Sequence, residues 1–303
     1  MMKNRAYWKP RVIAQLKETL YILKLMIQSR LKRLVFGSHV EAFLVNTRQG
    51  LFLVDPEDMG VGNSLIKTGA YGEDEIQRIC SLVDEKSSVL FVGTHVGALA
   101  IPVSRHVKRV VGIEANPATF ALLEKNIGLN NCANFHAIQL AASDEKGELE
   151  FLLNRTNSGG SKRMPRVRAY KYFYDKPHVV KVKADKLDVA AFADYTVIVM
   201  DIEGSEYYAL RGMPMILSRA SHLIMEFLPH HLKNVANVSV GEMLALIEPW
   251  FDVLTIPSKG LVICKSQFLS VLEEMYHLYE GDDGLIFSKS AHFTATRDPD
   301  GHI

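Results

Sequence analysis

The sequence predicts an α/β fold with a doubly wound, mainly parallel sheet over residues 41–290. Short apolar runs alternate there with amphipathic stretches, a glycine turn follows one central run, and an acidic residue ends the next. The composition, 48% apolar and 23% charged residues, is ordinary for a globular chain with a sizeable core. Residues 1–40 predict a basic amphipathic helical extension, and residues 291–303 a frayed polar tail.

The N-terminal extension is strongly basic. Residues 1–33 carry nine lysines or arginines against one acid, Glu18. Apolar residues recur there at steps of three and four, the period of an amphipathic helix, at Ile13, Leu16, Leu20, Leu23, Ile27, Leu31 and Leu34. Lys17 and Lys24 keep each apolar run well short of the ~20 residues needed to cross a bilayer, and no signal-peptide cleavage site follows. Two interpretations stay open: an accessory helix packed on the main domain, or an interfacial helix on an anionic membrane.

The remaining elements follow in order. Residues 41–56 predict two short strands around a turn, and residues 72–84 a helix. Further strands are expected at 88–92, 109–113, 134–140, 148–154, 179–182, 196–200, 222–227, 251–256 and 284–288. Helices are expected between them at 98–106, 116–130, 206–213, 240–248 and 265–279. Ligands of such sheets bind beyond the carboxyl ends of the strands, which directs attention to the residues after Val92, Ile113 and Met200.

The first of these strand ends carries a glycine turn. Gly93 and Gly97 enclose Thr94, His95 and Val96, and each glycine allows a sharp turn close to a ligand. Because His95 occupies the middle of this GxxxG pattern, the GxGxxG turn of dinucleotide-binding proteins is absent. No Gly-Lys-Ser/Thr follows, so the turn is not a phosphate-binding Walker A loop either.

The second strand end carries an acid. Glu114 lies 21 positions after Gly93, where a carboxylate can accept both hydroxyls of a ribose. The alternative role of Glu114 is to favour the start of the helix near Pro117. Together, the glycine turn and the acid predict an adenosyl ligand, with Asn116 at the edge of the adenine.

At this point the sequence resembles the FkbM family of methyltransferases. The resemblance rests on VGTHVG, GIEANP and AASDEKGELEF between Val89 and Phe151 and on MDIEGSEYYALRGM at 200–213, and it spans residues 42–288. It implies a seven-stranded class I methyltransferase sheet with a final antiparallel strand, S-adenosylmethionine as cofactor, and a hydroxyl acceptor. It also places Gly93, Thr94, His95, Gly97 and Asp201 around the cofactor. One departure is Phe91, which stands where the family usually has an acid.

The strands after residue 196 carry the candidate acceptor chemistry. Asp201 and Glu203 follow one strand, and Glu226 and His230 end or follow the next. Methyl transfer needs positioning of the acceptor and removal of its proton, so we expect Asp201, Glu203 and His230 to be catalytic and Glu226 to contact the substrate. Asp201 with Glu226 could also hold a divalent cation, but nothing in their spacing demands it, and no metal is predicted.

Residues 157–174 form a basic stretch with interleaved aromatic residues. We expect Lys162, Arg163 and Arg166 to bind an anionic acceptor through their charges, although a solvated loop is an equally good interpretation. The net charge of the whole chain is only +1, so nucleic acid is not expected as a partner.

The sequence therefore predicts an S-adenosylmethionine-dependent O-methyltransferase that acts on a glycan, a lipid-linked sugar or a secondary metabolite. Phe91 motivates one alternative, a non-catalytic methyltransferase-like binding protein, and a nicotinamide-dependent oxidoreductase is a weaker one. Three widely spaced cysteines suit a reducing, cytoplasmic location, with peripheral membrane contact through residues 1–35 left open. The oligomeric state is not predicted.

Overall fold

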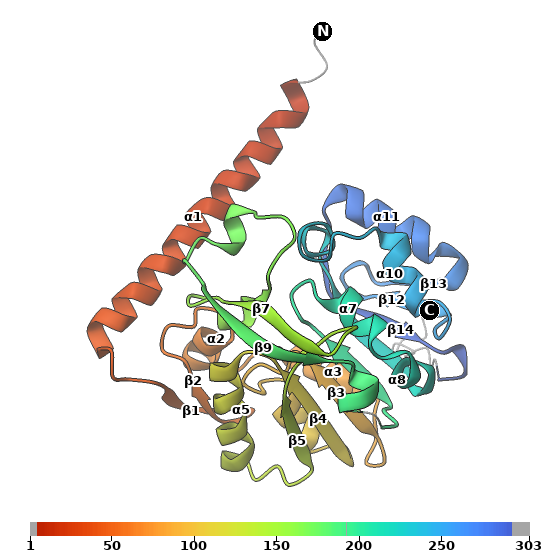
Figure 1. Ribbon diagram of the computed structural model, residues 1–303, viewed down its shortest axis with the longest axis horizontal. Helices are drawn as coiled ribbons and strands as arrows, with labels where there is room; N and C mark the ends of the chain where they lie inside the picture. Colours follow the sequence, from red (N-terminus) through yellow and green to blue (C-terminus); the bar gives the residue numbers. More distant parts are fainter. Residues whose placement is uncertain (1–4, 192, 293–303) are drawn as a thin grey trace, which may run out of the picture.

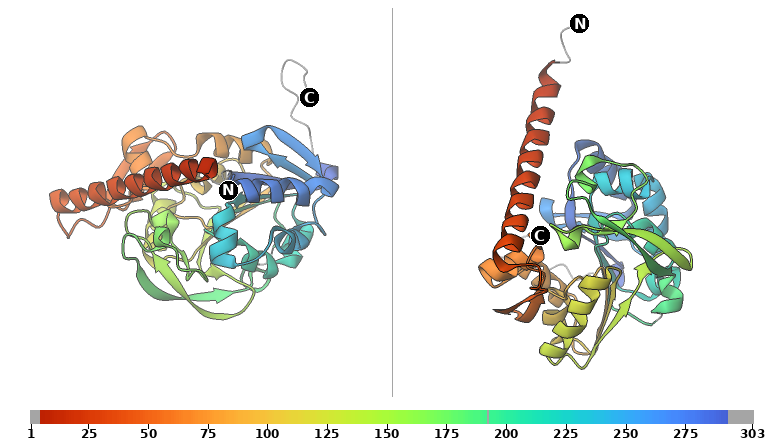
Figure 2. Two further views of the ribbon diagram at one scale, coloured as in Figure 1. Left: turned by 90° about the horizontal axis from the view of Figure 1, so that it is seen from above. Right: turned by 60° about the vertical axis from the view of Figure 1, so that its left-hand side comes forward.

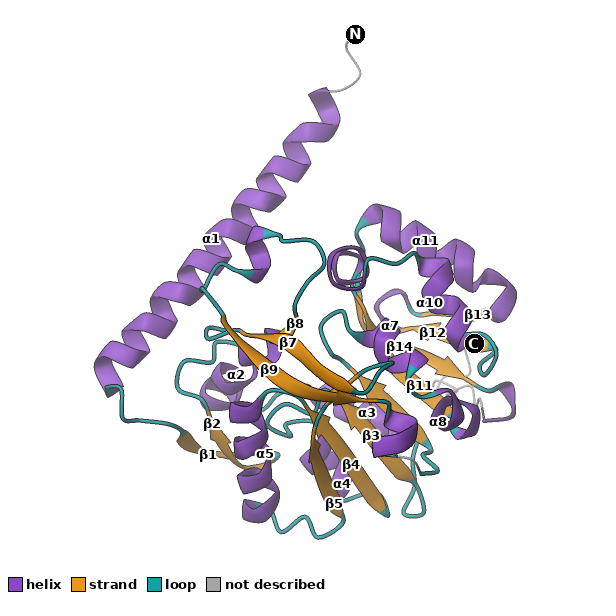
Figure 3. Cartoon of the chain, in the orientation of Figure 1, coloured by secondary structure: helices purple, strands orange, loops and turns teal. Residues whose placement is uncertain are grey.

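The centre of the fold is an eight-stranded sheet with the strand order β13-β12-β14-β11-β10-β3-β4-β5 (Figures 1 and 3). A computed structural model describes residues 5–191 and 193–292, and for residues 5–19, 21 and 292 it describes the backbone only. The strands of this sheet are β3 (Ser88–Val92), β4 (Arg109–Glu114), β5 (Phe135–Gln139), β10 (Val197–Met200), β11 (His222–Phe227), β12 (Val253–Ile256), β13 (Leu261–Cys264) and β14 (Asp282–Ser288).

Five neighbouring strands of this sheet, from β11 to β5, are parallel. Strand β14 runs antiparallel to both β11 and β12, and the strand order reverses direction between β3 and β10. The predicted doubly wound α/β class is therefore confirmed, and the reversal creates a switch point at the carboxyl ends of β3 and β10.

The predicted number of seven strands was wrong, because β13 adds an eighth at the edge of the sheet. A turn with Gly260 in the left-handed region, at φ +59°, joins β12 to β13. Strand β13 has four residues, three of them exposed, and its apolar run LVIC is too short to be told apart by sequence from the start of the helix predicted at 265–279.

Each face of the sheet packs against helices through its own core. On β3, Val89 and Phe91 belong to one apolar cluster and Leu90 and Val92 to the other, because successive side chains of a strand point to opposite faces. The helices that contribute to the first cluster are α2 (Val61–Thr68), α3 (Glu73–Ser81), α4 (Ala100–Ser104) and α5 (Pro117–Leu129). Those of the second are α6 (Leu187–Ala190), α7 (Glu206–Arg211), α8 (Pro214–Arg219), α10 (Val240–Ile247) and α11 (Phe268–Leu278).

A second sheet of four strands lies beside the main one, in the order β6-β9-β7-β8 (Figure 1). Its strands are β6 (Ala141–Ala142), β7 (Gly147–Leu153), β8 (Lys162–Arg163) and β9 (His178–Asp185). The sequence predicted β7 and β9 as additional strands but not β8, which lies within the basic stretch. A separate hairpin of β1 (Phe43–Thr47) and β2 (Gly50–Val54) precedes α2.

Helix α1 (Arg5–Phe36) projects beyond the rest of the fold (Figures 1 and 2). Among the described residues, no helix has both the length and the apolar content that a membrane crossing requires. Most of the predicted frayed tail, residues 293–303, lies outside the described residues. The cytoplasmic location remains a prediction, as does the division at residues 40 and 290.

Candidate functional site

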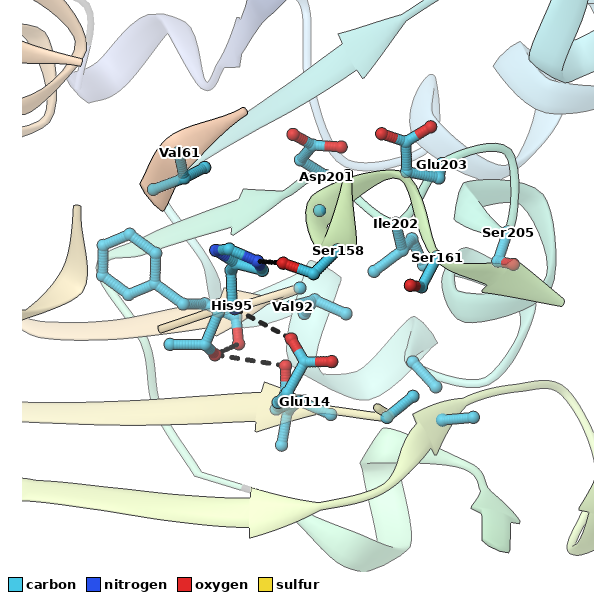
Figure 4. A pocket seen from close by; sticks show the side chains of 18 of the residues that line it. Val61, Val92, His95, Glu114, Ser158, Ser161, Asp201, Ile202, Glu203 and Ser205 are labelled. Atoms are coloured by element: carbon cyan, nitrogen blue, oxygen red, sulfur yellow. Dashed lines mark hydrogen bonds between the residues drawn. The ribbon is translucent and has the colours of Figure 1, made fainter. Parts of the chain in front are cut away.

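A cavity of about 240 Å³ lies at the switch point of the sheet. Its lining comes from the loops that follow β3, β4 and β10, together with β7, β8 and the segment around Ser158. Figure 4 shows His95 and Glu114 on one side of it and Asp201 and Glu203 on another. The three strand ends that the sequence singled out therefore meet in one place.

The glycine turn after β3 is shaped by two glycines with different roles. Gly93 has φ +89°, and a Cβ on it would lie 1.8 Å from the carbonyl oxygen of Asp201, so the turns after β3 and β10 pack directly on each other. Gly97, at φ +87°, faces Ile101 and Leu123 of the core instead. Gly93, Thr94 and His95 line the cavity as predicted, whereas Gly97 does not contribute to the lining.

Glu114 lies at the tip of β4 with its side chain in the cavity lining. Its carboxylate accepts hydrogen bonds from the backbone N–H groups of His95, at 2.8 Å, and of Asn116, at 2.7 Å. Burial raises the pKa of Glu114 despite these hydrogen bonds and despite the nearby His95. Glu114 therefore joins the turns after β3 and β4, and a carboxylate has lone pairs left for ribose hydroxyls.

The structure places Asn116 in a different role from the predicted adenine contact. Its side-chain oxygen accepts hydrogen bonds from the N–H groups of Ala118 and Thr119, so Asn116 caps the N-terminus of α5. Its side-chain nitrogen faces Ser161 at 3.4 Å, and Asn116 is not among the residues that line the cavity. The Asn-Pro sequence is a helix-start signal, and here the local capping role accounts for it.

His95 connects the cofactor turn to the basic stretch. It has φ +52°, and its Nε2 lies 2.7 Å from the Ser158 hydroxyl (Figure 4). Its Nδ1 is buried without a hydrogen-bond partner among the described residues. Sequence reasoning missed Ser158, which lies 63 positions away and belongs to a segment interpreted only through its charges.

The cavity wall near β4 is apolar. It is formed by Ala115, Leu140, Ala141, Leu149 and Phe151. An adenine is mainly an apolar plane with polar edges, so this wall matches it. No local pattern predicted this wall, because β7 contributes to it only through the second sheet.

Phe91, the departure from the FkbM pattern, also lines the cavity, and Glu75 of α3 lines it too. Burial, together with Asp283, raises the pKa of Glu75 to about 7, although Arg78 opposes this shift. Glu75 therefore supplies an acidic side chain to the cavity, although Phe91 of β3 stands where the FkbM family usually has an acid. Nothing in its local sequence distinguished it from other surface acids.

Carboxylates gather at the other side of the cavity and behind it: Asp201 and Glu203 line the cavity, whereas Glu206 and Glu226 do not. Oxygens of Asp201, Glu206 and Glu226 all lie within 4.8 Å of one another. Loss of solvation and mutual repulsion, chiefly with Glu226, raise the pKa of Asp201 well above its usual value, although its side chain is open to the cavity. The pKa of Glu226 is raised well above its usual value by burial and by Glu203 and Glu206. Two of the predicted acceptor-side residues, Asp201 and Glu226, thus form one coupled group.

Glu206 has a structural role within this group. Its Oε1 accepts hydrogen bonds from the N–H groups of Ile202, at 3.0 Å, and Gly204, at 3.2 Å. These bonds fix the turn that carries Asp201 and Glu203.

Glu203 behaves differently from its acidic neighbours. It has φ +58°, which directs its side chain to Lys162 Nζ at 2.6 Å and to His231 Nε2 at 3.2 Å. Burial alone would raise the pKa of Glu203, but Lys162 and His231 outweigh burial and hold the pKa well below its usual range. Glu203 is therefore ionised and paired.

His230, the predicted base, is not among the residues that line the cavity. Its Nδ1 lies 3.3 Å from the Tyr172 hydroxyl, and burial and His231 lower the pKa of His230 strongly. The neighbouring His231 instead lies between Glu203 and Glu226, with its Nδ1 3.2 Å from Glu226. Of two adjacent histidines, only the fold reveals which one faces the carboxylates.

The basic stretch turns Lys162 and Arg163 inward, whereas Arg166 is exposed. Lys162 is buried against Glu203, and the Arg163 guanidinium lies 3.6 Å from the centre of the Tyr208 ring. Arg166 donates a hydrogen bond from Nε to the Tyr208 hydroxyl at 3.0 Å. Only Arg163 lines the cavity, and its Nη1 is buried without a hydrogen-bond partner among the described residues. Lys162 and Arg166 therefore differ from the predicted anion contacts.

Comparison with known proteins bears on the identity of this cavity. Residues 66–155 match the profile of the TRM5/TYW2 methyltransferase domain. No curated protein matches the chain. The matched segment includes β3, the glycine turn, β4 and Glu114, and it confirms the prediction of a methyltransferase that uses S-adenosylmethionine.

Solved structures give distant likenesses. The methyltransferase FkbM from Methylobacillus flagellatus is 14% identical with a TM-score of 0.40, covering 68% of this chain and 44% of that one. Trm5b from Pyrococcus abyssi is 13% identical with a TM-score of 0.39, covering 73% and 52%. The tRNA m1G37 methyltransferase of M. jannaschii is 14% identical with a TM-score of 0.42, covering 84% and 58%. The chain thus spans less than two thirds of each of these proteins.

These findings correct one prediction and leave another unsupported. The exclusion of nucleic acid as a partner does not stand, because residues 66–155 match the TRM5/TYW2 methyltransferase domain. The low overall charge did not justify that exclusion. Membership of the FkbM family is not shown, since that likeness is only one distant match among others.

Proposed function

We propose that this protein transfers a methyl group from S-adenosylmethionine to a hydroxyl group held beside Asp201 and Glu226. The observation that carries this proposal is the division of one cavity into two chemically distinct halves. One half has an apolar wall and Glu114, and the other has Asp201 and Glu203, with Glu206 and Glu226 close behind Asp201.

The first half suits the adenosyl group. The wall around Leu140 and Phe151 would hold the adenine, and Glu114 would accept hydrogen bonds from the ribose. Glu75, which lines the same cavity, would hold the ammonium group of the methionine part, and Asp201, at the border of the two halves, would serve the acceptor. When bound, S-adenosylmethionine supplies an electrophilic methyl group on a sulfonium, and a cavity rich in carboxylates suits that positive charge.

The second half suits removal of the acceptor proton. Asp201 and Glu226 hold protons more tightly than ordinary carboxylates, and a base whose pKa approaches the working pH is the most effective proton acceptor. The ionised member of this pair would accept the proton of an acceptor hydroxyl placed beside it. Glu203 remains ionised beside Lys162 and His231, so its charge adds to the basicity of the pair.

The acceptor is best described as an uncharged hydroxyl compound, such as a sugar unit of a glycan. Glu203 already engages Lys162, and the carboxylates would repel a phosphate close to the reacting oxygen. The free Nη1 of Arg163 offers one hydrogen bond for a polar group farther from this oxygen.

An RNA acceptor is the second candidate. The match of residues 66–155 to the TRM5/TYW2 methyltransferase domain favours it. In that case a nucleoside would occupy the acid-lined half, and the phosphate chain would have to remain outside it.

Transfer of tritiated methyl groups tests both candidates. The protein is incubated with labelled S-adenosylmethionine and with separate RNA, glycan and small-molecule fractions, and the labelled fraction identifies the acceptor class. Asp201→Asn and Glu226→Gln should each lower kcat by about 100-fold, the usual range for loss of a general base. The control Glu150→Gln changes an exposed acid and should leave kcat unchanged. Label confined to RNA would replace the first candidate by the second, and full activity of both variants would overturn the proton-transfer role.

A further inference from the structure

Helix α1 is attached to the fold by a side that carries polar residues. Ser29 is buried, Arg33 pairs with the buried Glu57, and Lys32 Nζ lies 3.5 Å from the Asn63 side-chain oxygen. Arg155 also reaches Glu57, at 3.3 Å, so one buried acid links the helix to the body through two arginines. Met26, which is partly buried, lies beside Ser29 and Arg33 on this side of the helix, so a face of mixed polarity rather than the stripe of exposed leucines makes the attachment.

The apolar stripe of α1 consequently faces away from the body. Leu20, Leu23, Ile27, Leu31 and Leu34 are between 50% and 79% exposed. Their steps of three and four place them on one face, and at about 1.5 Å per residue the stripe is ~21 Å long. Figures 1 and 2 show that much of α1 extends away from the sheets. A contiguous exposed apolar stripe of this kind indicates a binding surface.

The charge around this stripe identifies its partner. Lys24 and Arg30 are exposed within the same stretch of helix, and residues 1–33 hold nine lysines or arginines against the single acid Glu18. A second protein surface would need matching acids as well as an apolar groove. An anionic bilayer offers both an apolar interior and a negative surface along its whole area, and amphipathic helices with basic residues lie in such interfaces.

The length and composition of α1 fit a helix that lies on a bilayer rather than one that crosses it. Lys24 and Arg30 interrupt the apolar positions, and α1 does not meet the requirement for a membrane span over the residues described. We propose that the exposed stripe from Leu20 to Leu34 binds the surface of an anionic membrane and holds the methyltransferase domain against it. This inference stands independently of the acceptor proposed above.

Flotation with vesicles tests the proposal on the full chain. Vesicles of phosphatidylcholine and phosphatidylglycerol at a 3:1 ratio are compared with vesicles of phosphatidylcholine alone. The unmodified protein should float with the anionic vesicles and lose this binding as the salt concentration rises, because salt screens the charges. The triple variant Leu23→Gln, Ile27→Gln and Leu31→Gln should bind at least about tenfold more weakly, since it removes the inserted side chains.

The matched control replaces two exposed leucines of α11. Leu269 and Leu278 are 43% and 59% exposed, and their change to Gln should leave vesicle binding unaltered. Glutamine is a good helix former, so circular dichroism should show unchanged helix content in both variants. Binding of S-adenosylmethionine by the triple variant provides a second check on folding.

Three outcomes would overturn the proposal. The first is failure of the unmodified protein to bind anionic vesicles at low salt. The second is equal binding by the unmodified protein and the triple variant. The third is a dimer, detected by light scattering, that the triple variant converts to a monomer, because a second copy of the chain would then cover the stripe.

Discussion

The two halves of the cavity hold their acids in opposite ways. Glu114, beyond β4, is a single buried carboxylate that accepts hydrogen bonds from two backbone N–H groups. Beyond β10 and β11, four acids share a small volume with one lysine and one histidine, as the contacts of Glu203 with Lys162 and His231 show. The first arrangement depends on backbone geometry, and the second depends mainly on charge, with Glu206 alone accepting backbone hydrogen bonds among the contacts described above.

This difference explains what each half can do. A carboxylate fixed by the backbone offers a rigid hydrogen-bond acceptor, which suits recognition of a ligand that never changes. Coupled carboxylates exchange protons readily, which suits the changing charges of a reaction. The two halves meet at Gly93, whose missing side chain lets the Asp201 carbonyl approach.

The largest loss of stability is expected from a substitution at Gly93, where the two halves of the cavity touch. Gly93→Ala places a Cβ 1.8 Å from the Asp201 carbonyl oxygen on a backbone with φ +89°. Since both the contact and the dihedral are incompatible with a side chain, the variant should lose about 3 kcal/mol or more of unfolding free energy. Urea denaturation measures this loss. Gly147→Ala, where a Cβ meets nothing within 4 Å, is the control, and equal stability of the two variants would disprove the contact.

A smaller loss of stability is expected when Lys162, the cation that pairs with Glu203 in the acceptor half, is removed. Lys162→Met leaves Glu203 without its 2.6 Å partner in a buried site, which should cost about 3 kcal/mol. Lys259→Met breaks an exposed pair with Glu280 and should cost less than about 1 kcal/mol.

The affinity of Lys162→Met for S-adenosylmethionine tests whether the two halves of the cavity are energetically separate. If the halves are energetically separate, Lys162→Met should retain this affinity within about threefold, because Glu114 is held by the backbone. Calorimetry measures the affinity and denaturation the stability. A large loss of cofactor affinity in Lys162→Met would show that the two halves are not separate.

The smallest effect concerns pH and Glu75. Because the pKa of Glu75 is raised to about 7, the folded protein binds its proton more tightly than the unfolded chain does. The protonated carboxyl therefore favours folding at low pH, and this contribution is lost as the pH rises from about 5 to about 8.

Thermal unfolding of Glu75→Gln checks this sign. The variant cannot ionise, so its Tm should exceed that of the unmodified protein by about 3 °C at pH 8, with a smaller difference at pH 5. Glu150→Gln, at an exposed position, should show no such trend. A Tm difference that stays constant across this pH range would contradict the buried environment of Glu75.

The main sheet could be predicted because its signals are local. Strand β4 and helix α5, for example, follow from an apolar run, an acid and an Asn-Pro start within about 20 residues, and the structure has both. The same locality led to one misassignment. Asn116 carries a capping signal that sequence reasoning assigned to ligand contact, and its side chain caps α5.

The acceptor half was less predictable because its contacts are distant in the chain. Lys162 lies 41 positions from Glu203 and 69 from His231 in the chain. Because Lys162 pairs with Glu203, it neutralises an acid instead of binding an anionic acceptor as predicted. Glu75 reaches the cavity from a helix that precedes β3. No spacing rule links such residues, since the second sheet and α3 bring them together only in the folded chain.

Titration calorimetry with S-adenosylmethionine tests the central claim most directly. The unmodified protein should bind the cofactor with micromolar affinity, and Glu114→Gln should bind at least about tenfold more weakly, because the amide replaces a carboxylate that accepts ribose hydrogen bonds. Absence of binding at millimolar cofactor, or equal affinity of the two proteins, would contradict the assignment of this cavity.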